Sequence, residues 1–538
     1  MNCLKRIPRL LLFLALILFL EVSGLPAAPW QEMDLVIRSA RIIDGTGNPS
    51  FLADVAIRGD TIAAVQRGLP LKGRREIDAA GLVLAPGFID IHTHARRGIF
   101  DVPTAENYVR QGVTTLVEGP DGSSPIPLGK FLDQAAAARL SVNFASFLGQ
   151  GSVRQEILGD VDRPATPEEV EKMCALVRIG MQEGAFGLST GLFYVPGTFT
   201  PTAEVIELAK VAGRMGGMHI SHMRDEAAGV IDSVKEAIAI GEQGGLPTQI
   251  THHKIIGKRN WGRSRDTLRL VDEARTRGVD VTIDQYPYTA SSTSVQAALM
   301  PAWALEGGRG QVLKRLKDPA ARARIRDTTV NLLRNERGGG DPQNVQMARC
   351  DWNLTLAGRR LGDITRERGM LPSLENAAET VLWIVEQGGC QGIFHAISED
   401  DLESILRHPA TMIGSDGEVP VFGKASPHPR SYGTFARVLG RYVRDRKVLT
   451  LEEAVRKMAS FPAQRLGLQD RGLLRKEMKA DLVLFHPGEV TDRATYENPH
   501  QYAEGVRLVL VNGEVIFESG SMQASRPGRI LYGPAFRK

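Results

Sequence analysis

Short apolar runs recur through the middle of the chain, and most of them end in polar side chains. Between them lie segments whose apolar residues recur with a helical period, such as 167–182, 203–215, 230–243 and 265–277. Strands that alternate with helices form parallel βα units, and eight such strands indicate an α/β protein built on a (β/α)8 barrel. The eight candidate strands are residues 87–94, 114–118, 142–148, 185–189, 217–222, 247–252, 279–286 and 411–415.

The two ends of the chain carry a different pattern, in which short alternating strands are separated by glycines. Residues 34–85 contain several such strands, and 480–485 and 506–517 contain more, with Asn512-Gly513 as a hairpin turn. Neither end has enough strands to bury a sheet face alone, so we expect one small β-sandwich domain formed from both. The expected limits of its two parts, and of the catalytic barrel between them, are residues 33–86, 466–538 and 87–465.

A long segment, about residues 296–409, separates the seventh and eighth candidate strands. Within it, residues 311–337 are charged and have a helical pattern. We expect a helical insertion that lies over one mouth of the barrel, before its last strand.

The first residues have the pattern of an export signal. Lys5, Arg6 and Arg9 precede the apolar run 10–20, and small residues follow over 23–28. The run is shorter than the roughly 20 residues that a membrane span needs. We therefore expect a signal peptide over residues 1–28, a secreted or periplasmic protein, and no membrane span after cleavage. An uncleaved N-terminal anchor is the alternative.

Composition narrows the function classes. The chain has 538 residues, which exceeds the size of a single core, and a formal net charge of only +4. It has no block of like charges, which argues against a nucleic-acid partner. After the predicted export signal, three cysteines remain: Cys174, Cys350 and Cys390. An odd number at irregular spacing is not a disulfide framework, although export to an oxidising compartment would permit one pair. No feature of the sequence indicates an oligomeric state.

Candidate metal ligands fall at the carboxyl ends of the predicted strands, where the active site of a (β/α)8 barrel lies. His92 and His94 end the first strand, and residues two apart in a strand share a face. His222 ends the fifth strand, His252 ends the sixth, and Asp416 follows the eighth. A lone His is as often a core residue as a ligand, but five such residues on one rim are hard to obtain by accident.

Imidazole and carboxylate ligands suit Zn2+, and a catalytic zinc site keeps one position for water. The ion lowers the pKa of that water towards about 7 and polarises a carbonyl oxygen. Asp416 is the candidate general base and acid, which takes the proton of the water and passes it to the leaving amine. Its alternative role is a helix N-cap within Gly-Ser-Asp-Gly.

The order of these residues resembles that of the amidohydrolase superfamily, whose members are metal-dependent hydrolases on a TIM-like barrel. The opening stretch 86–94 and the closing stretches 480–483 and 511–513 carry this resemblance. Within the superfamily, the chain is similar to the N-acyl-D-amino-acid deacylase (D-aminoacylase) group. The stretches that resemble this group are 112–115, 187–192, 221–224, 251–254, 286–289, 414–417 and 428–430.

The resemblance implies a role for each metal-type residue. His222 and His252 would hold a tightly bound zinc ion, His92 and His94 would form a second, weaker subsite, and Asp416 would be the catalytic acid and base.

The resemblance also implies a substrate site. Lys254, Tyr286 and Arg430 would grip the α-carboxylate of the substrate, and a bidentate arginine suits such an anion. For Lys254 and Arg430 the alternative is solvated surface charge.

One position departs from the group, which has a metal-binding cysteine after strand two. Aligned on 112–115, that place falls on Asp121, and Glu118 could also turn inward. A carboxylate in place of a thiolate weakens the preference for zinc, so Mn2+ or Co2+ becomes more tolerable and the site could hold one or two ions.

These features predict hydrolysis of the amide bond of N-acyl-D-amino acids, which gives a carboxylate and a free D-amino acid. The alternative is another C–N hydrolase of the superfamily, such as a dipeptidase or a cyclic-amide hydrolase. Such enzymes commonly carry a lysine after strand four, whereas residues 188–191 contain none. A barrel without enzymatic activity is a further alternative. Such a protein would be expected to have lost some of the five metal-type residues, whereas this chain has all five.

Overall fold

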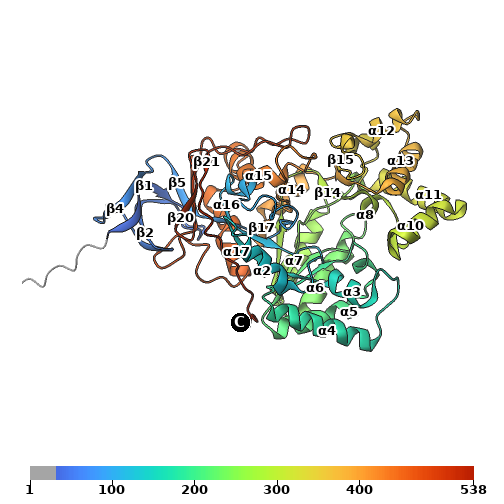
Figure 1. The fold of residues 1–538 in the computed structure, drawn as a ribbon, viewed down its shortest axis with the longest axis horizontal. Coiled ribbons are helices and arrows are strands. Elements are labelled where there is room, and N and C mark those ends of the chain that lie inside the picture. Colours follow the sequence, from blue (N-terminus) through green and yellow to red (C-terminus); the bar gives the residue numbers. More distant parts are fainter. Residues whose placement is uncertain (1–31, 538) are drawn as a thin grey trace, which may run out of the picture.

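The computed structural model describes residues 32–537, so the predicted signal peptide lies outside the described residues. Eight parallel strands form the centre of the molecule (Figure 1). One of the eight is interrupted at Phe147, which divides it into β8 and β9. The strands are β6 (Phe88–Asp90), β7 (Val113–Glu118), β8 (Asn143–Ser146) with β9 (Leu148–Gly149), β10 (Gly187–Gly191), β11 (Met218–His222), β12 (Thr248–Ile250), β13 (Val281–Gln285) and β17 (Thr411–Ile413).

Backbone hydrogen bonds connect these strands into a ring. β6 pairs with β7 and β7 with β8, while β9 to β13 and β17 form a second parallel sheet. The two sheets meet where β8 runs on into β9. They meet again beyond β6 and β17, where the Asp416 amide donates to the His92 carbonyl at 2.8 Å and the His94 amide donates to the Gly417 carbonyl at 2.7 Å. The predicted (β/α)8 architecture is therefore confirmed.

Helices surround these strands and connect them. The helix α4 illustrates how the sequence fixes their limits: Thr166 and Glu169 form a capping box, and Pro167 occupies the first turn. The helices are α1 (Glu106–Val109), α2 (Leu128–Ala137), α3 (Gln150–Leu158), α4 (Pro167–Gln182), α5 (Thr202–Arg214), α6 (Val230–Gly244), α7 (Ser264–Thr276), α14 (Glu399–Arg407), α15 (Arg430–Arg437), which continues as the π-helix η5 (Val438–Asp445), α16 (Leu451–Met458) and α17 (Ser460–Arg465).

The insertion before the last barrel strand contains a small sheet as well as the predicted helices. Its three strands pair antiparallel in the order β14, β16, β15. A disulfide joins Cys350 to Cys390. The elements are β14 (Ser291–Ser294), α8 (Val295–Leu299), α9 (Ala302–Leu305), α10 (Gly308–Lys317), α11 (Pro319–Asn335), β15 (Val345–Arg349), η4 (Leu354–Leu356), α12 (Leu361–Glu367), α13 (Leu374–Gln387) and β16 (Gln391–Phe394). The next helix, α14, packs on α7 and β17 and thus belongs to the barrel.

Both ends of the chain contribute to one nine-stranded sheet, on the left of Figure 1. Strand β18 pairs antiparallel with β5, which joins the two ends as predicted. The hairpin between β19 and β20 turns at Asn512 and Gly513, whose φ angles of 48° and 83° suit a tight two-residue turn. The strands are β1 (Met33–Ile42), β2 (Phe51–Arg58), β3 (Thr61–Gln66), β4 (Gly73–Asp78), β5 (Val83–Pro86), β18 (Leu482–Phe485), β19 (Val506–Val511), β20 (Glu514–Glu518) and β21 (Ser521–Met522).

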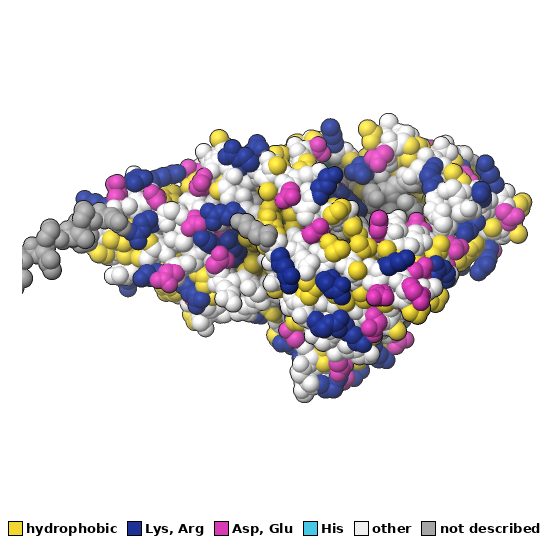
Figure 2. All heavy atoms as spheres, turned by 60° about the horizontal axis from the view of Figure 1, so that its bottom comes forward, with side chains coloured by type: hydrophobic (Ala, Val, Ile, Leu, Met, Phe, Trp, Pro, Cys, Tyr) yellow, Lys and Arg dark blue, Asp and Glu magenta, His cyan; other side chains and the backbone are white. Residues whose placement is uncertain are grey.

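The surface carries charges of both signs. Figure 2 shows Lys and Arg side chains interspersed with Asp and Glu over the face in view. Among the helices of residues 32–537, none combines the length and the apolar character needed to cross a bilayer.

Candidate active site

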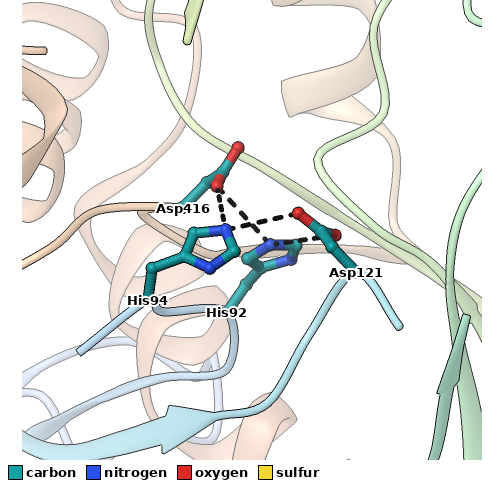
Figure 3. Close-up of side chains that lie close together, drawn as sticks. All are labelled: His92, His94, Asp121 and Asp416. Carbon is teal, nitrogen blue, oxygen red and sulfur yellow. Dashed lines mark ion pairs between the residues drawn. The ribbon is translucent and has the colours of Figure 1, made fainter. Parts of the chain in front are cut away.

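Four side chains converge at the carboxyl ends of the first, second and eighth barrel strands (Figure 3). His92 and His94 follow β6, Asp121 follows β7 and Asp416 follows β17, and each offers a ligand atom within 4.8 Å of the others. His94 Nε2 lies 3.3 Å from Asp121 Oδ2 and 3.1 Å from Asp416 Oδ1. The four side chains are buried, and they could hold one metal ion together.

A second group of three lies beside the first. Asp121, His222 and His252 also offer ligand atoms within 4.8 Å of one another. Asp121 Oδ1 lies 3.3 Å from His252 Nε2 and 3.6 Å from His222 Nδ1. Asp121 is therefore shared by both groups, in the position of a bridging ligand.

Glu118, the other carboxylate considered after strand two, lies outside both groups. Its Oε2 accepts a hydrogen bond from the Arg96 amide at 2.9 Å, and its Oε1 lies 3.6 Å from Arg96 Nε. The loop after β7 thus directs Asp121 towards the imidazoles and Glu118 towards Arg96.

The backbone is unusual at three of the converging residues. Asp121, His252 and Asp416 have φ angles of 56°, 35° and 53°, in the left-handed region that non-glycine residues rarely adopt. Such conformations persist where the surrounding fold imposes them, and they cluster at functional sites.

The ring nitrogens of these histidines show that the residues fit a metal ion. Both ring nitrogens of His92 and of His222, together with Asp121 Oδ1, are buried without a hydrogen-bond partner among residues 32–537. Buried polar atoms are nearly always hydrogen-bonded, so a cluster of unpartnered acceptors indicates a bound cation. Imidazole and carboxylate donors are those that zinc takes in catalytic sites.

Comparison with known proteins agrees with this geometry. Residues 75–517 match the profile described as "Amidohydrolase family". The chain belongs to the amidohydrolase family.

Among its relatives, this amidohydrolase is 34% identical over 529 residues to the D-aminoacylase of Alcaligenes xylosoxydans xylosoxydans, a match that covers 93% of this chain and 98% of that one. It is also similar to the crystal structure of N-acyl-D-glutamate deacylase from Bordetella bronchiseptica complexed with zinc and a phosphonate inhibitor. The TM-score is 0.80 at 34% identity, with 93% of this chain and 100% of that one covered. A D-aminoacylase structure whose description refers to a binuclear metal centre has a TM-score of 0.79 at 34% identity, with the same coverage of both chains.

A buried carboxylate, Glu226, lies behind the second group of this amidohydrolase. It lies 3.2 Å from His252 Nδ1 and 3.7 Å from His222 Nε2. Lys254 Nζ lies 2.5 Å from its Oε1, and Arg337, which arrives from the insertion, lies 2.9 Å from its Oε2. Burial opposes ionisation, but Lys254 and His222 keep the pKa of the Glu226 carboxyl well below its usual range.

Asp284, on β13, holds the backbone of the site. Its Oδ1 accepts a hydrogen bond from the His252 amide at 2.7 Å and lies 3.5 Å from His92 Nδ1. Such outer partners fix the orientation of metal-binding imidazoles. Sequence reasoning missed Glu226, Asp284 and Arg337. A charged residue inside the buried strand 281–285 was the available signal for Asp284, whereas nothing in the sequence marks Arg337.

The three predicted substrate-binding residues all lie near Asp416 or the imidazoles. Arg430 Nη1 lies 2.8 Å from Asp416 Oδ2, and its guanidinium lies 4.7 Å from the centre of the Tyr286 ring. The Tyr286 hydroxyl is buried without a hydrogen-bond partner among residues 32–537. Lys254, in contrast, is already engaged, because its Nζ contacts Glu226 and lies 2.7 Å from His252 Nδ1. All three are buried, so the alternative reading as solvated surface charge is wrong for Lys254 and Arg430.

The environment of Asp416 determines its protonation state. Burial alone would raise the pKa of its carboxyl, but the Arg430 guanidinium and the His94 imidazole lower that pKa. Asp416 is therefore ionised and able to accept a proton.

A cavity of about 240 Å³ opens beside this group. His94, Asp121 and Arg430 contribute to its lining. A small molecule in this cavity therefore reaches the candidate metal ligands and Arg430 at the same time.

Proposed function

We propose that this amidohydrolase hydrolyses the amide bond of N-acyl-D-amino acids, giving a carboxylate and a free D-amino acid. The observation that carries the proposal is the convergence of two ligand groups on Asp121, with Asp416 paired to Arg430, which lines the cavity beside them. Relatives that cover nearly the whole chain are named for this reaction, which supports the D-amino-acid class.

The residues suit distinct parts of such a substrate. Arg430 is the donor for the α-carboxylate, because a guanidinium binds a carboxylate through two parallel hydrogen bonds. The free hydroxyl of Tyr286 is a second donor beside it. Lys254 is the third predicted donor, but its contact with Glu226 offsets its charge.

Asp416 is the proposed general base and acid. Its carboxylate accepts a proton from the attacking water and later delivers it to the leaving amine nitrogen. Arg430 holds Asp416 in place by one of its nitrogens, so substrate orientation and proton transfer are coupled through a single ion pair.

The proposed metal ligands are His222, His252 and Asp121 for one ion and His92, His94, Asp121 and Asp416 for another. Zinc bound there would supply a Lewis acid that polarises the carbonyl and acidifies water. Because Asp121 is a hard oxygen ligand, we expect Mn2+ or Co2+ to replace zinc more readily than at a thiolate site.

We infer that the protein is exported. The N-terminal pattern of an export signal supports this, and so does the Cys350–Cys390 disulfide, because disulfides persist mainly in oxidising compartments.

The test is a panel of N-acetyl-D-amino acids and their L-enantiomers, assayed with zinc-loaded protein. We expect turnover of D-substrates only, and a fall in kcat of about 10²–10⁴-fold in Asp416→Asn, which leaves the group of Asp121, His222 and His252 intact. Equal turnover of both enantiomers, or of neither, would overturn the substrate assignment. Asp492→Asn is the matched control, since Asp492 pairs with Arg437 at 2.8 Å and lies outside both ligand groups and the cavity.

A further inference from the structure

The cavity beside the candidate metal ligands continues into a larger one. The inner chamber, about 240 Å³, includes His94 and Asp121 in its lining, and an outer chamber of about 900 Å³ includes Asp416. The two share five lining residues, so they adjoin one another. The shared residues are Arg97, Ser292, Gln391, Glu418 and Arg430.

The inner chamber is polar but presents little free charge. Ser123, Ser152 and Thr293 line it, together with several glycines. Its two other arginines are already engaged, since Arg96 donates to the Ser123 carbonyl at 2.8 Å and Arg97 donates to Glu418 at 2.8 Å. This chamber suits the reacting amide and a small polar side chain.

The outer chamber is lined by both apolar and charged side chains, the charged ones including Arg349, Asp351 and Lys424. Its apolar residues come from two segments. Leu354 and Ala357 come from the insertion, and Val419 and Val421 come from the loop after β17. Leu354 exposes 64% of its surface. An apolar ligand in this chamber would cover it.

The walls of the outer chamber are tied together. The Cys350–Cys390 disulfide joins the insertion loop to the residue before Gln391, which lines both chambers. The Ser426 amide donates to the Ala348 carbonyl at 2.9 Å, which connects the insertion to the loop after β17. A groove fixed in this way binds an extended ligand without first paying the entropy of ordering its own walls.

We propose that the outer chamber binds the hydrocarbon chain of a long acyl group, so that the preferred substrates are long-chain N-acyl-D-amino acids. This inference rests on the proposed deacylase function. An acetyl group would leave the outer chamber unused, whereas small-ligand sites are typically about 300–1,000 Å³ and are largely filled by their ligands. Arg430, at the junction of the chambers, would hold the α-carboxylate while the chain extends outward past Asp416.

The test compares kcat/KM for the acetyl, hexanoyl and decanoyl derivatives of one D-amino acid. Each methylene that leaves water can contribute roughly a fourfold gain in binding, so we expect at least about a tenfold rise from acetyl to decanoyl. Leu354→Asp should remove at least about fivefold of this rise and leave the acetyl value unchanged. Leu371→Asp, an 80% exposed leucine of the same insertion, is the matched control and should change neither value.

The outcomes separate the two proposals. Turnover of the acetyl substrate with no dependence on chain length, or an equal effect of both leucine substitutions, overturns the acyl-chain inference alone. Absence of turnover at every chain length overturns the deacylase function, and this inference with it.

Discussion

Two clusters of buried polar side chains are assembled from distant parts of the chain, and they differ in how completely they are hydrogen-bonded. The first lies between the barrel and the terminal sheet. Asp481 accepts hydrogen bonds from Arg471, from the Asn143 side chain at 2.9 Å and from the Asn512 amide at 2.6 Å. Asn512 in turn donates to Asn143 Oδ1 at 2.8 Å, and only Asn512 Oδ1 in this cluster lacks a partner among residues 32–537.

The second cluster is the candidate active site, where His92, His222 and Asp121 leave several atoms without a partner in the described chain. The first cluster is hydrogen-bonded except for one amide oxygen, and it joins the barrel to the terminal sheet. The second cluster leaves buried polar atoms without partners unless a cation binds, and burying such atoms unpaired costs considerable desolvation free energy. A closed cluster, in which nearly all buried polar atoms have partners, holds two parts of the fold together. An open cluster, in which metal-type residues leave buried atoms without partners, is suited to bind a cation.

The largest effect should come from the residue shared by both ligand groups. Asp121→Ala removes an oxygen from each group, so both should lose metal. Metal-ion catalysis supplies several kcal/mol of transition-state stabilisation, so we expect activity to fall by at least about 10³-fold. Metal per chain, measured by elemental analysis after dialysis, should fall with it.

Glu118→Ala is the matched control from the same loop. Its carboxylate contacts Arg96 rather than the imidazoles, so its metal content should stay at the parental level. If Glu118→Ala lost metal and Asp121→Ala kept it, the assignment of the bridging position would be reversed.

Substitutions in the closed cluster should lower the free energy of unfolding rather than metal binding. Asp481→Ala removes the buried partner of Arg471, and breaking such a buried pair costs about 3–5 kcal/mol of unfolding free energy. Asp470 also contacts Arg471 but is half exposed, so Asp470→Ala should cost only about 0–1 kcal/mol. Urea unfolding measures both, and metal content should not change in either. Equal stability of the two variants would contradict the structural role of this cluster.

The sequence alone could predict much of the site because of barrel topology. Carboxyl ends of parallel strands meet on one rim, so the sequence predicts that His92, His222 and Asp416 converge there. The position of Asp121 follows from alignment with a ligand position of the group that the chain resembles, and its carboxylate lies in both ligand groups.

The features that the sequence could not predict arise from contacts between residues that are far apart in the chain, in the loops and in the insertion before the last barrel strand. The helical pattern of residues 311–337 predicts a helical insertion but does not reveal its sheet, because β14 (Ser291–Ser294) has no apolar pattern and β15 and β16 are short. The Cys350–Cys390 pair was one of several possibilities until the fold brought the two together. Arg337 reaches Glu226 from 111 positions away, and no local pattern encodes such a contact.

The smallest expected effect concerns Glu226, which lies behind the imidazoles. It tests whether Glu226 contributes to metal binding by the open cluster. Glu226→Gln keeps the shape of the side chain but removes the charge that faces His252, Lys254 and Arg337. Loss of such a partner typically weakens metal binding by about 10–100-fold. Titration with zinc in the presence of a competing chelator measures this. Glu236→Gln is the control, since Glu236 pairs with Arg224 at 2.8 Å without touching an imidazole. If Glu226→Gln lowered the free energy of unfolding but left the zinc affinity at the parental value, Glu226 would have a structural role only. The residues that affect metal binding would then be the ligands themselves.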